Sequence, residues 1–540
     1  MATSCSNFVG LLDGKLHPNH IDSAQKYCER AQPLLTLRNV ALAFLLYQAV
    51  AFIITAIYRI TFHPLAKFPG PFLAKITPLY EYYYTFVKDG KMVQHCMDNL
   101  HPQYGPIVRT MPNHLTINDS DAFHEVHSVG MKYLKDPGFY EGFRCPDSSF
   151  SAVDPYIHRK VRGLLNPMFS KATVLKHEPV VLEKAALVVK RIEGEIEKAG
   201  GNQTLLAMRR LIYAYIFEIA SDYIFAGKYD ILNQPDMKHR LLDGLVSAVE
   251  ALPMATHLPT LAYVLEKLFP YPVAVKLGLD ALTGQAELRQ GTHGEVKRIL
   301  AERESGTLKK KTIQGKPSVL SDLLDKGDEP GRVAREANFL IGAALEESAW
   351  TILATVYQLA ANKDCQQRFY EELKQLSPNK EEYVSFQQAE SNSYVAAVIK
   401  EALRVTTSVS GFLPRVCPPE GATIAGKHIP GGTVLDMSIY MVHNDPKIFP
   451  NPKKFDPERW LQPNSKKLDR YMVGFGAGTR ICLGMQLAYL NLYVGLSALF
   501  RKYEFDLTEE MKKEGWLWTE KMVSTKRGLE PDFLVKHRED

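Results

Sequence analysis

The sequence predicts a mainly α-helical fold with small β-sheets, attached to a membrane by one N-terminal helix. Helical periodicity of apolar residues recurs over long segments: 171–199, 204–226, 334–361, 363–376, 393–406 and 483–501. Shorter apolar runs bounded by proline and glycine, such as 421–440, predict strands and turns. Near the start, residues 39–58 form one uncharged run, which is long enough to cross a bilayer.

The run 39–58, NVALAFLLYQAVAFIITAIY, is best explained as a membrane span. At about 1.5 Å per helical residue, it reaches about 30 Å, the thickness of one hydrocarbon core. A signal peptide is disfavoured because a polar segment, residues 1–38, precedes the run and no small-residue cleavage site follows it. The flanking charges do not decide the orientation, because Arg59 and Lys67 do not outnumber the basic residues of the preceding segment.

The segment 59–75 is rich in proline and predicts a stiff elbow. Pro64, Pro69 and Pro71 each remove a backbone donor and restrict the residue before them, so a helix cannot continue through this segment. From residue 76 to residue 540 no linker divides the chain, which predicts one large domain. Within it, residues 444–470 combine many prolines with aromatic residues and predict an ordered meander without regular structure.

Composition excludes two classes of protein. The net charge of +5 is small for 540 residues, and the absence of a concentrated basic stripe argues against a nucleic-acid partner. The seven cysteines are odd in number, widely spaced and without a CxxC pair, so they do not form a disulfide framework. We expect most of the chain to lie in a reducing compartment.

The strongest chemical signal is the segment FGAGTRICLG, residues 475–484. Two glycines precede Cys482, one follows it, and an amphipathic helix begins directly afterwards. A thiolate bound to iron needs backbone N–H groups close to its sulfur, and small residues permit that approach. Those N–H groups and the positive end of the following helix would stabilise the negative sulfur.

This segment resembles the haem-ligand loop of the cytochrome P-450 monooxygenases, F-x-x-G-x-R-x-C-x-G, and the resemblance covers the chain after the membrane span. It implies that Cys482 is the axial thiolate ligand of haem b, within a cofactor-binding loop that includes Gly476. It further implies that Arg480 contacts a haem propionate and that Phe475 packs beneath the sulfur.

A second match is the pair Glu401 and Arg404, three residues apart on one helix face. Alone, such a pair is a common surface ion pair. Its position about eighty residues before Cys482, followed by FLPRVCP and FDPERW, makes the match specific. By resemblance, the pair joins Arg459 of the meander in a structural triad.

A third match is His158 and Arg162, whose i, i+4 spacing places both on one face of an early helix. Without context, a basic surface helix explains the pair equally well. By resemblance, the two bind haem propionates together with Arg415, whose planar guanidinium suits a carboxylate.

The central helix, LIGAALEESAW at 340–350, departs from the family pattern. By resemblance, an acid and a threonine on this helix, at a local distortion, relay protons to iron-bound dioxygen. Here Glu346 falls at the acid, Glu347 replaces the threonine and Ser348 follows, and we expect all three to be catalytic.

Several explanations of Glu347 remain open. Its carboxyl could have a raised pKa and donate the proton itself, since a charged group in a dry pocket is costly. Ser348 or a substrate hydroxyl could instead complete the relay. The reaction could also be an acid-assisted rearrangement, cyclisation or dehydration. Alternatively, Glu347 could turn away and pair with a basic residue.

Substrate contacts are expected around the distal face, at Phe339, Ala343, Val409 and Leu413, with the loop 134–150 and the residues 522–524 nearby. Because these positions are mainly apolar, a lipophilic small molecule is the expected substrate.

The segments YRITFHPLAKFPGP and HNDPKIFPNPKKFDPERW resemble the microsomal enzymes of filamentous fungi, which tailor terpenoids and polyketides in secondary metabolism. The resemblance implies dioxygen chemistry with electrons from NADPH through a flavoprotein reductase. It also implies a single-pass protein of the endoplasmic reticulum membrane, with residues 1–38 lumenal and the catalytic domain cytosolic.

Five basic residues predict a docking face for the acidic reductase: Arg159, Lys160, Lys466, Lys467 and Arg470. Two other classes stay open. One is an isomerase, cyclase or dehydratase on the same fold, and the other is a haem-binding membrane protein without catalysis. The second is disfavoured because a carrier would not need the electron donation of a thiolate.

Overall fold

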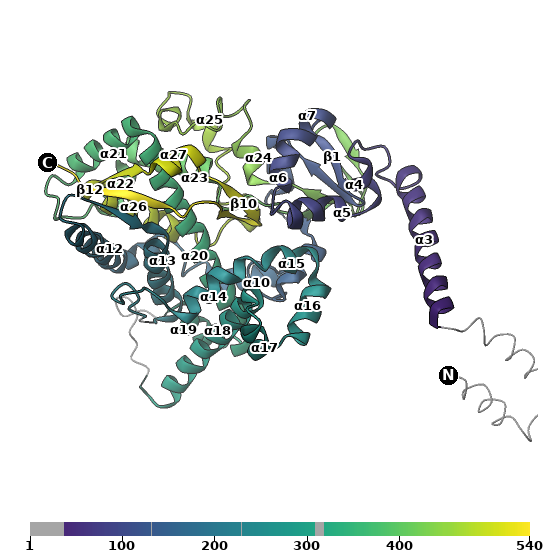
Figure 1. The fold of residues 1–540 in the computed structure, drawn as a ribbon, viewed down its shortest axis with the longest axis horizontal. Helices are drawn as coiled ribbons and strands as arrows, with labels where there is room; N and C mark the ends of the chain where they lie inside the picture. The colour runs from purple at the N-terminus through teal and green to yellow at the C-terminus, as the bar shows by residue number, and fades with distance from the viewer. Residues whose placement is uncertain (1–36, 131, 228, 308–317, 540) are drawn as a thin grey trace, which may run out of the picture.

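A computed structural model describes residues 37–130, 132–227, 229–307 and 318–539 (Figure 1). The predicted mainly helical architecture with small sheets is confirmed. The segment 1–38 assigned to the lumen lies outside the described residues except for its last two positions.

Helix α3 (Leu37–Thr61) contains the predicted span and extends slightly beyond it at both ends. It projects away from the rest of the protein (Figure 1), and none of its apolar window is buried. With a mean hydropathy of 2.4, it fits a membrane anchor. The helix ends three residues before Pro64, as the ring of proline requires, and a short helix, α4 (Phe72–Ile76), lies inside the proposed elbow. Arg59 ties the base of α3 to the domain, because its guanidinium donates to the carbonyl of Ile76 (2.5 Å).

A small β-rich part lies next to the base of α3 (Figure 1). Its five-stranded sheet has the order β1-β2-β8-β5-β3, with β2 and β8 parallel and the other pairs antiparallel. The strands are β1 (Ile107–Met111), β2 (His114–Ile117), β3 (Leu134–Lys135), β5 (Arg415–Val416) and β8 (Val434–Asp436), with the hairpin β6 (Ala422–Ile424) and β7 (Lys427–Ile429). Around it lie α5 (Leu79–Tyr82), the π-helices η1 (Tyr83–Val87) and η2 (Cys96–Leu100), α6 (Met92–His95), α7 (His101–Tyr104), α8 (Ser120–Val126) and α24 (Ile439–His443).

The larger part of the protein is built around one long helix, α20 (Pro330–Ala361), which is mostly buried. Because most of this helix is buried within the protein, its apolar composition indicates a core helix. The helices that pack against it are α13 (Met208–Phe225), α18 (Asp280–Glu304), α23 (Ser393–Thr406) and α26 (Met485–Lys502).

The remaining helices surround this core. They are α9 (Pro137–Tyr140), η3 (Glu141–Phe143), α10 (Pro155–Leu165), α11 (Lys171–Val174), η4 (Leu175–His177), α12 (Glu178–Lys198), α14 (Arg240–Val249), α15 (Leu252–His257), α16 (Pro259–Leu268), α17 (Tyr271–Lys276), α19 (Val319–Asp325), α21 (Lys363–Leu376), α22 (Phe386–Ser391) and α27 (Glu509–Glu514).

The predicted helix 204–226 is wrong at its start. Residues Gln203–Ala207 form strand β4, which pairs with β12 (Asp532–His537), and β12 pairs with β9 (Tyr503–Leu507). The local apolar periodicity could not reveal this, because the partner strand lies more than three hundred residues away. A further hairpin joins β10 (Trp518–Lys521) to β11 (Val523–Lys526).

The meander 444–470 is mostly irregular, as predicted, with one 3-10 turn, η6 (Pro457–Trp460), and one short helix, α25 (Lys466–Asp469). It is ordered by burial of Phe449, Phe455 and Trp460. The five cysteines that lie in described residues are free thiols, which agrees with the absence of a disulfide framework.

Candidate haem site and active site

Cys482 lies in a tight loop at the start of α26, after the 3-10 turn η7 (Gly478–Arg480). Its backbone N–H donates to the carbonyl of Phe475 (2.8 Å), which closes the loop. The backbone N–H groups of Gly484 and Met485 donate to the thiol. The sulfur therefore lies at the positive end of a helix, where a thiolate is stabilised.

Glycine is required in this loop for a steric reason. Gly478 has φ +64°, and a Cβ built on it would lie 1.9 Å from the backbone carbonyl oxygen of His127. Gly476 also has a positive φ, +76°. Gly478 allows the loop to lie against the end of α8, which a side chain at that position would prevent, whereas Gly476 is favoured by its positive φ alone.

The thiol of Cys482 faces an internal space. Protein surrounds it, and burial raises the pKa of the thiol to about 11, yet its side chain is accessible to solvent. Ala343, in the middle of α20, is likewise accessible although its neighbours Ile341 and Leu345 are buried. Both residues therefore border an interior space between α20 and the loop before α26.

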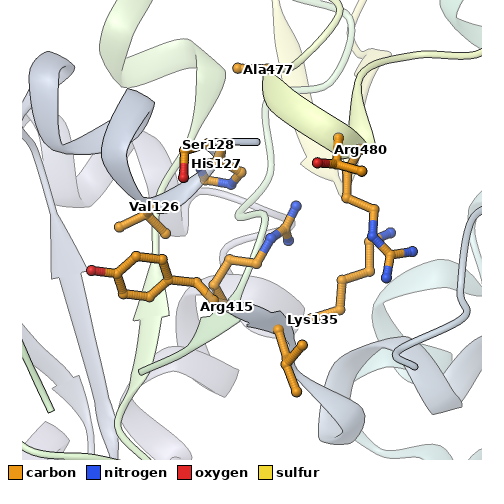
Figure 2. Close-up of a pocket in the computed structure, with 10 residues that line it drawn as sticks. Val126, His127, Ser128, Lys135, Arg415, Ala477 and Arg480 are labelled. Carbon is orange, nitrogen blue, oxygen red and sulfur yellow. The ribbon is translucent and has the colours of Figure 1, made fainter. Parts of the chain in front are cut away.

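Basic side chains gather at one edge of this region. Figure 2 shows Arg415, Arg480 and Lys135 converging below His127. Burial and the charges of Arg415 and Arg480 hold the pKa of Lys135 well below its usual range. Burial, then Arg415, lowers the pKa of Arg480 to about 10. No carboxylate of the described residues forms an ion pair with these groups, so the site favours an anion.

Helix α10 adds His158 and Arg162 to this cluster. His158 is buried, and burial together with the charges of Arg480, Arg162 and Lys135 lowers its pKa to about 3. Its Nδ1 and the Nη1 of Arg480 are buried without a hydrogen-bond partner among the described residues. Buried donors without acceptors are rare, and two haem propionates would supply both the acceptors and the negative charge. The residues present therefore fit haem, with Cys482 as the ligand of its iron.

The side chain of Phe475 also holds the loop in place. Its ring packs against that of Tyr489 on α26, with 5.1 Å between the centroids. This contact joins the loop to the following helix.

Glu401, Arg404 and Arg459 are in direct contact. Arg404 donates to both carboxylate oxygens of Glu401 (2.7 and 2.9 Å), and Arg459 donates to Oε1 (3.0 Å). The indole of Trp460 and the backbone N–H of Asp456 also donate to this carboxylate (2.9 Å each). Because Glu401 and Arg404 are fully buried, the meander is joined to α23 by a completely satisfied ionic network.

Across the interior space, α20 is unbroken from Pro330 to Ala361, without the distortion that the resemblance implies. Glu346 is buried and accepts a hydrogen bond from the hydroxyl of Tyr213 on α13 (2.9 Å). Burial raises the pKa of Glu346 to about 7 despite that hydrogen bond and the nearby charge of Arg209. Glu346 therefore faces α13 rather than the thiol.

Glu347 points in another direction, since neighbouring residues on a helix are separated by about 100°. Burial raises its pKa to about 8, and its Oε2 is buried without a hydrogen-bond partner in the described part of the chain. Its charge acts on the thiol of Cys482. The alternative in which Glu347 pairs with a basic residue finds no such partner among the described residues. Ser348 is buried beside it.

The residues expected to contact the substrate lie on α20 and in the segment before β5. The ring of Phe339 stacks on that of Phe150 (5.0 Å between centroids), which links α20 to the loop 134–150. Val409 and Leu413 are partly buried in the segment before β5. Gly411 in that segment donates its N–H to the carbonyl of Met522 (2.9 Å), so the two predicted wall segments are in contact.

Two residues of the site could not be found from the sequence. Lys135 lies in a short strand with no motif around it, and only the sheet pairing β3–β5 places it beside Arg415. Tyr213 is one of several tyrosines in an apolar helix, and its contact with Glu346 joins residues 133 positions apart.

Comparison with known proteins agrees with this geometry. The family model described as Cytochrome P450 matches residues 75–530. The chain is 30% identical to Cytochrome P450 monooxygenase aneF of Aspergillus aculeatus over 89% of this chain and 96% of the relative. It is 32% identical to Cytochrome P450 monooxygenase oblB of Cochliobolus heterostrophus, over 90% and 93%, and 30% identical to Cytochrome P450 monooxygenase astB of Aspergillus terreus, over 86% and 91%.

Proposed function

Because this chain belongs to the cytochrome P450 family and is a monooxygenase of that family, we propose that it oxidises a lipophilic terpenoid or polyketide intermediate of secondary metabolism. Similarity to fungal monooxygenases over nearly the whole chain supports the general activity. The apolar wall formed by Phe339, Val409 and Leu413 supports a lipophilic substrate.

The observation that carries the proposal is the position of Cys482 between the helix end that stabilises its thiolate and an interior space. When bound, haem b supplies the binding and reductive activation of dioxygen. The thiolate of Cys482 would hold the iron. Arg162, Arg415, Arg480 and His158 would hold the propionates, and Lys135 would lie beside them as a further hydrogen-bond donor.

Glu347 would hold the proton that the distal side needs. With a pKa of about 8 its carboxyl is mostly protonated at neutral pH, and its Oε2 has no competing protein partner in the described chain. A protonated carboxyl can donate directly, which a threonine hydroxyl does only as part of a relay. Ser348, buried beside Glu347, completes the distal set in this proposal, whereas Glu346 would act from the side of α13, where Tyr213 holds its carboxyl.

A second candidate function rests on the same residue. If Glu347 protonates a substrate rather than assisting oxygen chemistry, the site would catalyse a rearrangement, cyclisation or dehydration. Glu347 in the place of the usual threonine is the observation that favours it.

The chain would receive electrons from NADPH through a flavoprotein reductase. The five basic residues expected at the docking face are all solvent-exposed, on α10 and around α25. Helix α3 would anchor the protein to the endoplasmic reticulum membrane in a single pass, which would place lipophilic substrates close to the domain.

Product analysis in microsomes with a reductase tests both candidates. We expect a product that gains one oxygen atom from labelled dioxygen and that requires NADPH. A product that contains no oxygen from labelled dioxygen and forms without NADPH would favour the rearrangement, cyclisation or dehydration instead.

A further inference from the structure

A second cavity of about 200 Å³ lies beside the proposed distal pocket. It is bordered by α5, α9, α15 and β10, where the β-rich part meets the helical part. Phe412, Pro414 and Met522 form its inner wall. The same two segments border the proposed distal pocket, so the two spaces share a wall.

The cavity has an unusual concentration of carboxylates for a lipophilic substrate route. Four line it: Glu81, Asp136, Asp436 and Glu520. Two histidines, His114 and His257, also line it, whereas no lysine or arginine does so among the residues that the structure describes.

Each histidine is already paired with a carboxylate. His257 Nε2 lies 3.1 Å from Glu81 Oε1, and His114 Nδ1 lies 2.8 Å from Asp436 Oδ2. Burial disfavours the protonated form of His114. The charge and the hydrogen bond of Asp436 together have a larger effect and raise the pKa of His114 to about 9. Each pair therefore has at most one positive charge against one negative charge.

One carboxylate oxygen of Glu81 has no hydrogen-bond partner among the described residues. The residue is 4% exposed, and while Oε1 bonds His257, its Oε2 is buried without a partner among the described residues. An unpartnered carboxylate oxygen in a buried position is costly. A positive charge in the cavity would reduce that cost by neutralising the Glu81 carboxylate.

Glu520 and Asp136 are not neutralised by a cation that lines the cavity. Glu520 Oε2 accepts the backbone N–H of Val93 (3.1 Å), and Asp136 accepts two N–H groups at the start of α9. Lys91, whose charge acts on Glu520, donates to the carbonyl of Trp518 (2.5 Å). Lys521, the residue after Glu520 on β10, and Arg527, directly after β11, are both paired with Asp89 and Glu250.

Three aromatic rings complete the lining: Tyr82, Phe139 and Phe412. Aromatic faces attract cations because of the quadrupole of the ring. Carboxylates and aromatic rings together form the environment that recognises an ammonium group.

We propose that this cavity binds the positively charged ammonium group of a lipophilic amine substrate, whose apolar part extends past Phe412 and Met522 into the distal pocket. The inference deepens the proposed function and rests on it. A neutral alcohol would leave the negative charge of the carboxylates unbalanced, and an anion would be repelled by it.

The protonation of Glu520 agrees with this assignment. Burial, and then the charge of Glu81, raise the pKa of Glu520 to about 7, although His257 and Lys91 oppose the rise. Without a ligand, the cavity thus holds more negative charge than it can stabilise. A bound cation would stabilise the ionised form.

The test uses the full-length, haem-loaded protein and equilibrium dialysis of three radiolabelled probes with the same chain: octyltrimethylammonium, 1-octanol and octanoate. The quaternary ammonium is chosen because it cannot coordinate iron. We expect the cation to bind at least tenfold more tightly than octanol, and octanoate to bind most weakly.

Two variants locate the binding. Glu520→Gln and Glu81→Gln are each expected to weaken binding of the cation about tenfold, as the loss of one close charge predicts, and to change binding of octanol less than twofold. Glu510→Gln, at an exposed position on α27, should change neither. Equal affinity for cation and alcohol, or unchanged cation binding in both cavity variants, would overturn the proposal.

The absorption spectrum of the reduced carbon-monoxide complex, recorded on the same preparations, separates this inference from the proposed function. A normal spectrum with no cation preference rejects the amine site and leaves the haem-thiolate assignment intact. An absent spectrum rejects the ligand assignment, whereas dialysis still reports on the cavity.

Discussion

The carboxyl group of Glu347 on α20 and the thiol of Cys482 before α26 interact across the interior of the protein. Burial and the negative charge of Glu347 together raise the pKa of that thiol. The adjacent Glu346 instead hydrogen-bonds Tyr213 on α13. Two neighbouring acids therefore face two different environments, and the unusual one faces the proposed reaction space.

Replacement of the proposed iron ligand tests the haem assignment. We expect Cys482→Ala to abolish the absorbance of the reduced carbon-monoxide complex at the wavelength that gives the family its name, because no other thiolate would hold the iron. Cys365→Ala, which alters a free thiol on α21, is the matched control and should keep the spectrum. A normal spectrum in the Cys482 variant would contradict the assignment.

The pH dependence of turnover tests the role of Glu347. Its raised pKa means that the carboxyl is protonated below about pH 8 and loses its proton as the pH rises through that value. If the protonated form is the donor, product formed per NADPH should fall above about pH 8. Glu347→Gln should lower this ratio at all pH values and remove the alkaline limb, and Glu347→Thr should restore a relay with a different pH profile. If both variants matched the parent enzyme, Glu347 would have a structural role alone.

The ionic network of the meander should be indispensable for stability. Glu401→Ala leaves the buried Arg404 without its carboxylate, which costs about 3–5 kcal/mol in comparable buried pairs. We expect a strongly lowered midpoint of thermal unfolding and loss of bound haem. Glu510→Ala, on the exposed surface, provides the comparison and should unfold at the temperature of the parent. An equally small effect of both changes would show that the network is dispensable.

Two tyrosines on α13 offer a matched pair. Tyr213→Phe removes the hydrogen bond to Glu346 and leaves a buried carboxyl oxygen unpaired, which costs about 1–3 kcal/mol. Tyr215→Phe removes a buried hydroxyl that has no hydrogen-bond partner among the described residues. The free energy of unfolding of this variant should therefore equal or exceed that of the parent protein. Chemical denaturation of both variants measures the difference. The opposite ranking would exclude the Tyr213–Glu346 contact as a stabilising interaction.

Removal of residues 1–61 tests the membrane anchor. The truncated chain should be released from membranes by alkaline carbonate, whereas the full-length protein should remain, because α3 is the exposed apolar helix of the described chain. The carbon-monoxide spectrum of the truncated protein serves as the control for folding. Retention of the truncated form after carbonate treatment would assign the anchoring to another surface.

Four features could be read from the sequence alone: the class of fold, the boundaries of α21 and α23, the exposed apolar helix α3 and the glycine-rich loop around Cys482. These features depend on local patterns: apolar periodicity, prolines that end helices, and glycines that allow a backbone to approach a sulfur. Each is contained within a short segment, so the chain does not need to be folded to reveal it.

Other features arise only when the folded chain brings distant segments together. Strand β4 replaced the first turn of a predicted helix because its partner β12 lies near the other end of the chain. The pairing of β3 with β5 places Lys135 beside Arg415 in the basic cluster. The direction of each side chain on α20 brings Glu346 to Tyr213 and Glu347 toward the thiol of Cys482. The acid-lined cavity likewise combines α5, α15 and β10. Burial and the charges of distant segments fix the protonation of such groups, and both exist only after the chain has folded.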